Sequence, residues 1–167
     1  MNLTEVFASF NSKKIAIVGD VMLDSYIIGK VHRMSPEAPV PVVLMQKEDH
    51  RLGGAANVAL NLKALGAEVF VCSVVGKDKY GQQLQQLFEL SSIYCQELFP
   101  METRQTTVKT RVLSGSQHLL RIDQEDTHDL DKEAETVLIQ AVKNRIDQGI
   151  DALVFEDYNK GVLTERV

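Results

Sequence analysis

Two adjacent glycines precede an asparagine at the start of a predicted helix, and this run has the chemistry to bind a small hydroxyl-rich molecule. The run is Gly53-Gly54-Ala-Ala-Asn57, and the helix is expected over residues 57–65. Glycine has no Cβ, so the backbone can approach a ligand closely, and a helix start offers free N–H groups at the positive end of its dipole. The amide of Asn57 can both donate and accept hydrogen bonds. A tight turn that binds nothing is the alternative reading of a Gly-Gly pair.

Charged side chains follow two of the predicted strands. Asp24 comes shortly after residues 14–19, and Asp157 and Lys160 come after residues 151–155. In open α/β sheets, ligands bind outside the carboxyl ends of the strands, so these groups are expected at one edge of the sheet. A carboxylate can accept hydrogen bonds from sugar hydroxyls, and a lysine suits a phosphate. On position alone, Asp24 could equally cap a turn and Lys160 could be solvated.

Two arginines, Arg111 and Arg121, lie on opposite arms of a predicted hairpin and could face one anionic group or form an exposed charged face. No Gly-x-x-x-x-Gly-Lys-Ser/Thr loop and no Gly-x-Gly-x-x-Gly run occurs in the sequence. The histidines and cysteines lack metal-ligand spacing, so no metal site is expected. These residues are His32, His50, His118, His128, Cys72 and Cys95.

The composition is that of a globular protein that avoids nucleic acid and membranes. The 167 residues are 44% hydrophobic and 25% charged, with a net charge of −5. A negative net charge disfavours binding to nucleic acid and to anionic lipid. No apolar run approaches the ~20 residues of a membrane span, and the N-terminus lacks the basic start of a signal peptide. A cytoplasmic location is therefore expected.

The order of predicted elements favours an α/β fold with a mainly parallel open sheet flanked by helices. Strands are expected over residues 14–19, 68–75 and 151–155, and helices over residues 57–65, 80–90 and 131–148. The segments near residues 26–46 and 105–123 do not fit this alternation. We expect them to form extra strands that project from the sheet as a small lid. The chain as a whole is expected to be one domain, incomplete at its C-terminal side.

Several motifs resemble those of the ribokinase-like sugar kinases. The first signature of that family resembles Val18-Gly-Asp-Val-Met-Leu-Asp24 followed by the diglycine run. Residues 33–42, Arg-Met-Ser-Pro-Glu-Ala-Pro-Val-Pro-Val, are similar to the matching stretch of bacterial D-glycero-β-D-manno-heptose 7-phosphate kinases, as are residues 109–114 and 157–161. That kinase is often the N-terminal half of a bifunctional protein whose second half is an adenylyltransferase in ADP-heptose synthesis.

The resemblance implies an ATP- and Mg²⁺-dependent transfer of phosphate to a sugar that already carries one. By position, Asp24 would hold sugar hydroxyls, with Asp20 a weaker candidate. The resemblance also places Gly53, Gly54 and Asn57 in the sugar pocket. Asp157 is a further candidate from its position after a strand, and Arg111, Arg121 and Lys160 are candidates for the phosphate from their charge and placement. The projecting strands would form the lid, which in this family often also makes a dimer contact.

The family's second signature, a Gly-Ala-Gly-Asp run that carries the catalytic base, is absent from the sequence. The resemblance places it, with the Mg²⁺ motif and the adenine pocket, beyond Val167. We therefore expect these 167 residues to hold the sugar side of the site, to be inactive alone and to self-associate through the lid or the exposed sheet. A kinase for another sugar or nucleoside, or a sugar-phosphate-binding module without kinase activity, remain as alternatives.

Overall fold

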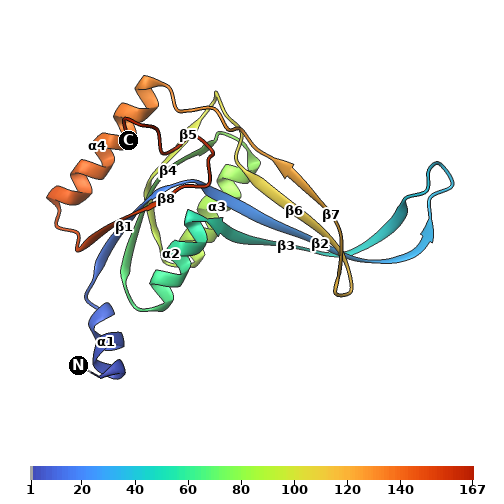
Figure 1. Cartoon of the computed structure of the whole chain (residues 1–167), viewed down its shortest axis with the longest axis horizontal. Helices are drawn as coiled ribbons and strands as arrows, with labels where there is room; N and C mark the ends of the chain where they lie inside the picture. The colour runs from blue at the N-terminus through green and yellow to red at the C-terminus, as the bar shows by residue number, and fades with distance from the viewer. Residues whose placement is uncertain (1) are drawn as a thin grey trace.

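The computed structural model describes residues 2–167 as two four-stranded sheets with helices on the first (Figure 1). The first sheet has the order β5-β4-β1-β8, and all of its neighbouring strands are parallel. Its strands are β1 (Lys14–Gly19), β4 (Glu68–Gly76), β5 (Tyr94–Met101) and β8 (Ala152–Glu156). The α/β class with a mainly parallel sheet is thus confirmed.

Helices cover both faces of this first sheet. On one face, α2 (Ala55–Ala64) and α3 (Lys79–Leu90) pack against buried residues such as Ile17 and Val71. On the other face, α4 (Lys132–Asp147) packs its Leu138 against Val18 and Cys72. Adjacent residues of one strand therefore serve two cores, because side chains alternate across a sheet. In Figure 1, α4 lies on the opposite side of the sheet from α2 and α3.

The second sheet has the order β3-β2-β6-β7 and extends away from the first (Figure 1). Its strands are β2 (Val21–Met34), β3 (Pro41–Gly54), β6 (Val108–Ser114) and β7 (Gln117–Gln124). β2 pairs antiparallel with β3 and parallel with β6, while β6 and β7 form a hairpin. β2 and β3 extend beyond the predicted segment 26–46, whereas β6 and β7 lie close to the predicted segment 105–123. Their function as a lid stays a prediction.

The predicted helices all form, with shifted boundaries. α2 begins two residues before Asn57. Gly54, with φ 57°, ends β3 and is the N-cap of α2. Asp78 and Asp131 cap α3 and α4 by accepting hydrogen bonds from backbone N–H groups in the first turn. Two elements were not predicted: β5, and the N-terminal helix α1 (Leu3–Phe10), which has no buried residue.

Candidate functional site

Asp24 lies near the start of β2, the strand that follows β1. The chain passes from β1 to β2 through the single residue Asp20, so β2 starts at the carboxyl edge of the first sheet. The side chain of Arg111 on β6 reaches Asp24, with 2.6 Å between Nη1 and Oδ1. Both side chains are 22% exposed, so the ion pair is partly shielded but still open to a ligand. One carboxylate oxygen stays available, since a carboxylate can accept about four hydrogen bonds.

The two glycines end β3 beside this carboxylate. A Cβ on Gly53 would lie 2.8 Å from Oδ2 of Asp24, closer than real Cβ atoms come to an oxygen. At Gly54, φ is 57° and a Cβ would lie 2.5 Å from the carbonyl oxygen of Asp20. The following N–H, of Ala55, donates to that same carbonyl at 3.0 Å. Gly54 therefore needs glycine for its backbone conformation, whereas a side chain at Gly53 would press on the side chains of Asp24 and Met22.

A cavity of about 430 Å³ lies against Asp24 and Asn57. Apolar groups of α2 and α3 and polar groups of β2 and β3 share its wall. Its lining residues are Asp24, Tyr26, His50, Arg51, Leu52, Asn57, Leu60, Leu87 and Ser91. An exposed amide and a carboxylate on an apolar floor match the mixed surface of a sugar, which has hydroxyls at its edge and C–H groups on its faces.

Tyr26 lies between two guanidinium groups at this cavity. The guanidinium carbon of Arg51 is 4.6 Å, and that of Arg111 5.3 Å, from the centre of the Tyr26 ring. Tyr26 and Asp24 are two residues apart on β2, so they share a face of the sheet. The sequence reasoning missed Tyr26 and Arg51, although the i, i+2 spacing from Asp24 and the cross-strand pairing of Asp24 with Arg51 could have indicated them.

Asp20 is buried, and it organises the segment after β8 instead of facing the cavity. Its carboxylate accepts hydrogen bonds from the backbone N–H groups of Tyr158 at 2.8 Å, Lys160 at 3.1 Å and Val162 at 3.2 Å. The guanidinium of Arg104 donates to the carbonyl of Lys160 at 2.7 Å. Asp20 is only 1% exposed, so this segment is anchored by a buried anion.

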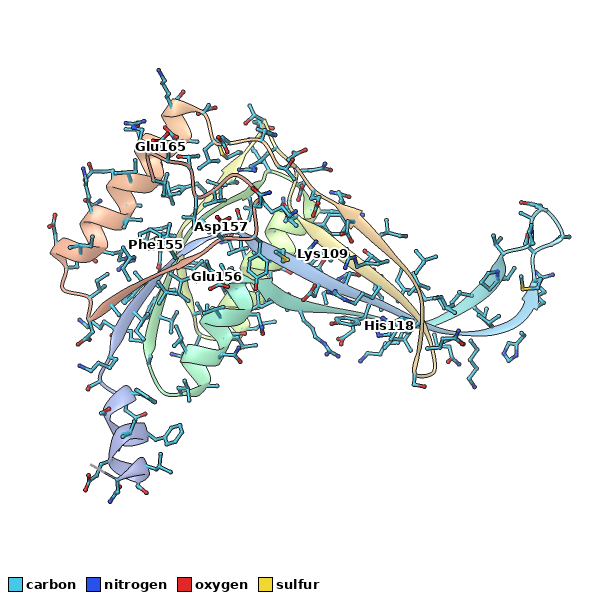
Figure 2. All side chains as sticks on the ribbon, viewed as in Figure 1. Lys109, His118, Phe155, Glu156, Asp157 and Glu165 are labelled. Carbon is cyan, nitrogen blue, oxygen red and sulfur yellow. The ribbon has the colours of Figure 1, made fainter. Side chains whose placement is uncertain are left out.

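Asp157, in the same segment, accepts a hydrogen bond from the N–H of Asn159 at 2.7 Å and so closes a local turn. Burial raises the pKa of the neighbouring Tyr158, and the negative charges of Glu156 and Asp24 add to that rise. Figure 2 shows Glu156 and Asp157 at the end of β8 near the second sheet, and His118 near the turn of the β6–β7 hairpin.

The side chain of Lys160 contacts the second sheet. Its ammonium lies 3.0 Å from Oε1 of Glu125, which follows β7. Lys109 on β6 lies 3.3 Å from the other oxygen of Glu125. Arg121 is 59% exposed and pairs with Asp123 at 2.9 Å. Lys109 and Glu125 were not predicted as site residues, because each alone looks like an ordinary surface charge.

The structure thus brings part of the predicted set together. Asp24 and Asn57 line one cavity, and Gly53 and Arg111 adjoin Asp24. Arg121 is paired with Arg111 in the register of the β6–β7 hairpin, whereas Lys160 and Asp157 belong to the segment held by Asp20. The roles of these residues in binding stay predictions.

Within residues 2–167, no group of three or more His, Cys, Asp or Glu side chains is arranged to hold a metal ion. Over the same residues, no helix combines the length and the apolarity that crossing a bilayer requires.

Comparison with known proteins assigns the fold to a family. The model of the pfkB family carbohydrate kinases matches residues 12–164. The chain belongs to the pfkB family of carbohydrate kinases. The ribokinase-like resemblance of its signatures is therefore confirmed. A carbohydrate kinase from Agrobacterium tumefaciens superposes with a TM-score of 0.63 over 86% of this chain and 45% of its own, at 21% identity, and so shares the fold.

Curated pfkB-type relatives are closer in sequence. The bifunctional protein HldE of Helicobacter pylori (strain P12) is 44% identical over 151 residues, which is 90% of this chain and 32% of that protein. HldE of Pelobacter propionicus is 42% identical over 166 residues, covering 99% of this chain and 34% of its own. The chain therefore spans about a third of the length of the curated relatives it matches.

Proposed function

We propose that this chain forms the sugar-binding side of a kinase that phosphorylates a sugar phosphate. The observation that carries the proposal is the cavity in which the Asp24 carboxylate, with Gly53 against it, meets the Asn57 amide. Asp24 and Asn57 together can accept from and donate to neighbouring hydroxyls, and Gly53 leaves room for the Asp24 carboxylate beside it. Membership of a carbohydrate kinase family supports this reading.

The substrate is proposed to be D-glycero-β-D-manno-heptose 7-phosphate, converted to the 1,7-bisphosphate for ADP-heptose and lipopolysaccharide precursor synthesis. The sequence resemblance of residues 33–42 and the similarity to HldE proteins support this choice. The basic side chains beside the cavity, Arg111 above all, could hold the phosphate already on the sugar. A downstream adenylyltransferase domain is proposed on the same grounds, since the HldE relatives are named bifunctional and are about three times longer.

ATP and Mg²⁺ are implied for the complete reaction. An Arabidopsis thaliana ribokinase solved with ribose and ATP shares the fold, with a TM-score of 0.56 at 12% identity. ATP would supply the phosphoryl group that becomes bonded to a sugar oxygen. The described residues contain no cluster of acidic side chains suited to Mg²⁺ and no Gly-Ala-Gly-Asp run, so we assign neither the metal ligands nor the catalytic base to them. We propose that the 167 residues alone do not turn over substrate.

Self-association through the second sheet is proposed as well. Apolar side chains of this sheet stand in solvent, among them Leu44 at 64%, Met45 at 57%, Leu120 at 50% and Ile122 at 54% exposure. Burying such side chains against a second copy would remove apolar surface from water, which favours association. A monodisperse monomer in light scattering would count against it.

Calorimetric titration tests the binding proposal. We expect the chain to bind D-glycero-D-manno-heptose 7-phosphate and not fructose 6-phosphate, and Asp24→Ala to abolish the heat with little change in thermal unfolding. Equal binding of both sugars would favour a kinase for another sugar. Binding to neither, here and in a chain extended to the length of HldE, would overturn the proposal. Turnover by the extended chain and not by this one would separate the kinase from a binding module.

A further inference from the structure

Glu125 lies between two lysines that come from different parts of the fold. Its Oε1 is 3.0 Å from the ammonium of Lys160, and its Oε2 is 3.3 Å from that of Lys109. The lysine side chains are only 15% and 17% exposed, and Glu125 is 26% exposed. The hydrogen bond from Lys160, and next the one from Lys109, hold the pKa of Glu125 below its usual value. Glu125 thus pairs with two largely shielded cations, of which Lys109 also lies 3.3 Å from Oδ2 of Asp123.

This contact joins the second sheet to the first. Lys109 is on β6 and Glu125 follows β7, whereas Lys160 belongs to the segment after β8. Among the residues the structure describes, no other ion pair links the second sheet to the rest of the chain. Figure 2 shows Lys109 at the end of the second sheet nearest the first, well away from His118 near the turn of the β6–β7 hairpin.

The backbones of the two lysines are held by hydrogen bonds to other parts of the fold. The backbone of Lys160 is fixed by Asp20 and by Arg104, and Lys109 sits on a strand paired on both sides. Glu125 lies just past the end of β7 and can turn its side chain to solvent by rotating about its own bonds. If the Glu125 side chain turns away, the ammonium of Lys160 is left for another anion, and that of Lys109 keeps only Asp123 beside it.

A phosphate monoester is the anion that fits these two cations better than a carboxylate does. It carries about −1.5 to −2 charges at neutral pH and three acceptor oxygens, against one charge and two oxygens for Glu125. Lysine binds phosphate as a point charge, so two ammonium groups can share one phosphate. A neutral sugar offers nothing that competes with Glu125.

We propose that Glu125 is an internal stand-in for the substrate's phosphate, which displaces it from Lys109 and Lys160 and so selects phosphorylated over neutral sugars. The inference rests on the proposed function in naming a sugar phosphate as the ligand. It adds Glu125 as a specificity-determining residue and Lys109 as a phosphate ligand. Displacement also opens the one ionic link between the sheets, so the phosphate would control how the second sheet sits on the first.

The test removes the competing charge and follows inorganic phosphate. In Glu125→Gln, we expect the backbone amide NMR signals of Lys109 and Lys160 to respond to phosphate with a dissociation constant about two- to fivefold lower than in the unmodified chain, the range that corresponds to exposed ion pairs. The matched control is Asp151→Asn, which also removes one negative charge beside a lysine, here from the Lys13–Asp151 ion pair near the start of β1. Sodium chloride at equal ionic strength controls for screening.

Equal phosphate affinity in Glu125→Gln and Asp151→Asn would overturn the inference, as would an unchanged phosphate response in Lys160→Met. Failure of the proposed function looks different. If only the proposed function fails, the unmodified chain and its extended form bind no heptose 7-phosphate, while Glu125→Gln still binds inorganic phosphate more tightly than the unmodified chain.

Discussion

Replacing Asp20 tests whether one buried carboxylate holds the segment after β8. Asp20→Ala removes the acceptor of three backbone N–H groups, those of Tyr158, Lys160 and Val162. Hydrogen bonds to charged groups contribute about 1.5–3 kcal/mol each, but three bonds that share one acceptor are not additive, and freed N–H groups can turn to water. We therefore expect a loss of about 3–5 kcal/mol in the free energy of unfolding, a large share of the ~5–15 kcal/mol typical of a domain.

Urea unfolding followed by circular dichroism measures this loss, and hydrogen exchange locates it. Exchange at Tyr158, Lys160 and Val162 should accelerate more than exchange in α4. The matched control is Asp151→Ala, since Asp151 also accepts a backbone N–H, that of Lys14 at 2.8 Å, but is 37% exposed. We expect the control to lose much less stability than Asp20→Ala, because water screens the exposed Asp151 carboxylate. An Asp20→Ala loss no greater than that of the control would refute the reasoning.

Three further outcomes are expected. Gly53→Ala should weaken binding of heptose 7-phosphate about tenfold, because the new Cβ would press on the Asp24 carboxylate. The control is Gly115→Ala, whose Cβ would meet open space and whose φ is 61°. It should cost only about 1 kcal/mol of stability and leave calorimetric binding unchanged. Burial alone would raise the pKa of Asp78. Hydrogen bonds from the N–H and hydroxyl of Thr106 and from N–H groups in the first turn of α3 outweigh burial, so they hold this pKa below its usual value. The stability from Asp78 should therefore be full above about pH 4 and fall away as pH drops further, so the urea midpoints of Asp78→Asn and the unmodified chain should converge near pH 2. Burial raises the pKa of Cys72 to about 12, so in the folded chain at pH 8 a thiol reagent should modify Cys95 and leave Cys72 intact, as mass spectrometry would show.

Apolar runs in the sequence predicted three of the four strands of the first sheet. The apolar runs at residues 14–19 and 68–75 became β1 and β4 of the first sheet, because buried parallel strands read as continuous apolar runs. The run at residues 151–155 became β8, an edge strand that is only partly buried. β5 escaped prediction since Glu97 and Pro100 interrupt its pattern, which is compatible with its place at the edge of the sheet.

The site depends on pairings that no local pattern contains. Asp24 and Arg111 are 87 residues apart, and they meet only because β6 returns parallel to β2. Lys160 and Glu125 could each be taken for a solvated charge, and only the docking of the second sheet makes them partners. The resemblance to known kinases supplied Asp24 and Asn57, but the register of the strands decides which cations stand beside them.

Only Asp20 lies between β1 and β2, so a small rotation at this residue would displace the far end of β2 by a large distance. β2 has 14 residues, so at about 3.3 Å each its far end lies as much as about 45 Å from Asp20. A rotation of about 10° at this fulcrum would move the hairpin tip about 8 Å, while Asp24, four residues along, would shift by only about 2 Å. A sweep of the outer strands would therefore move Asp24 much less than the hairpin tip, but still by a distance comparable with a hydrogen bond.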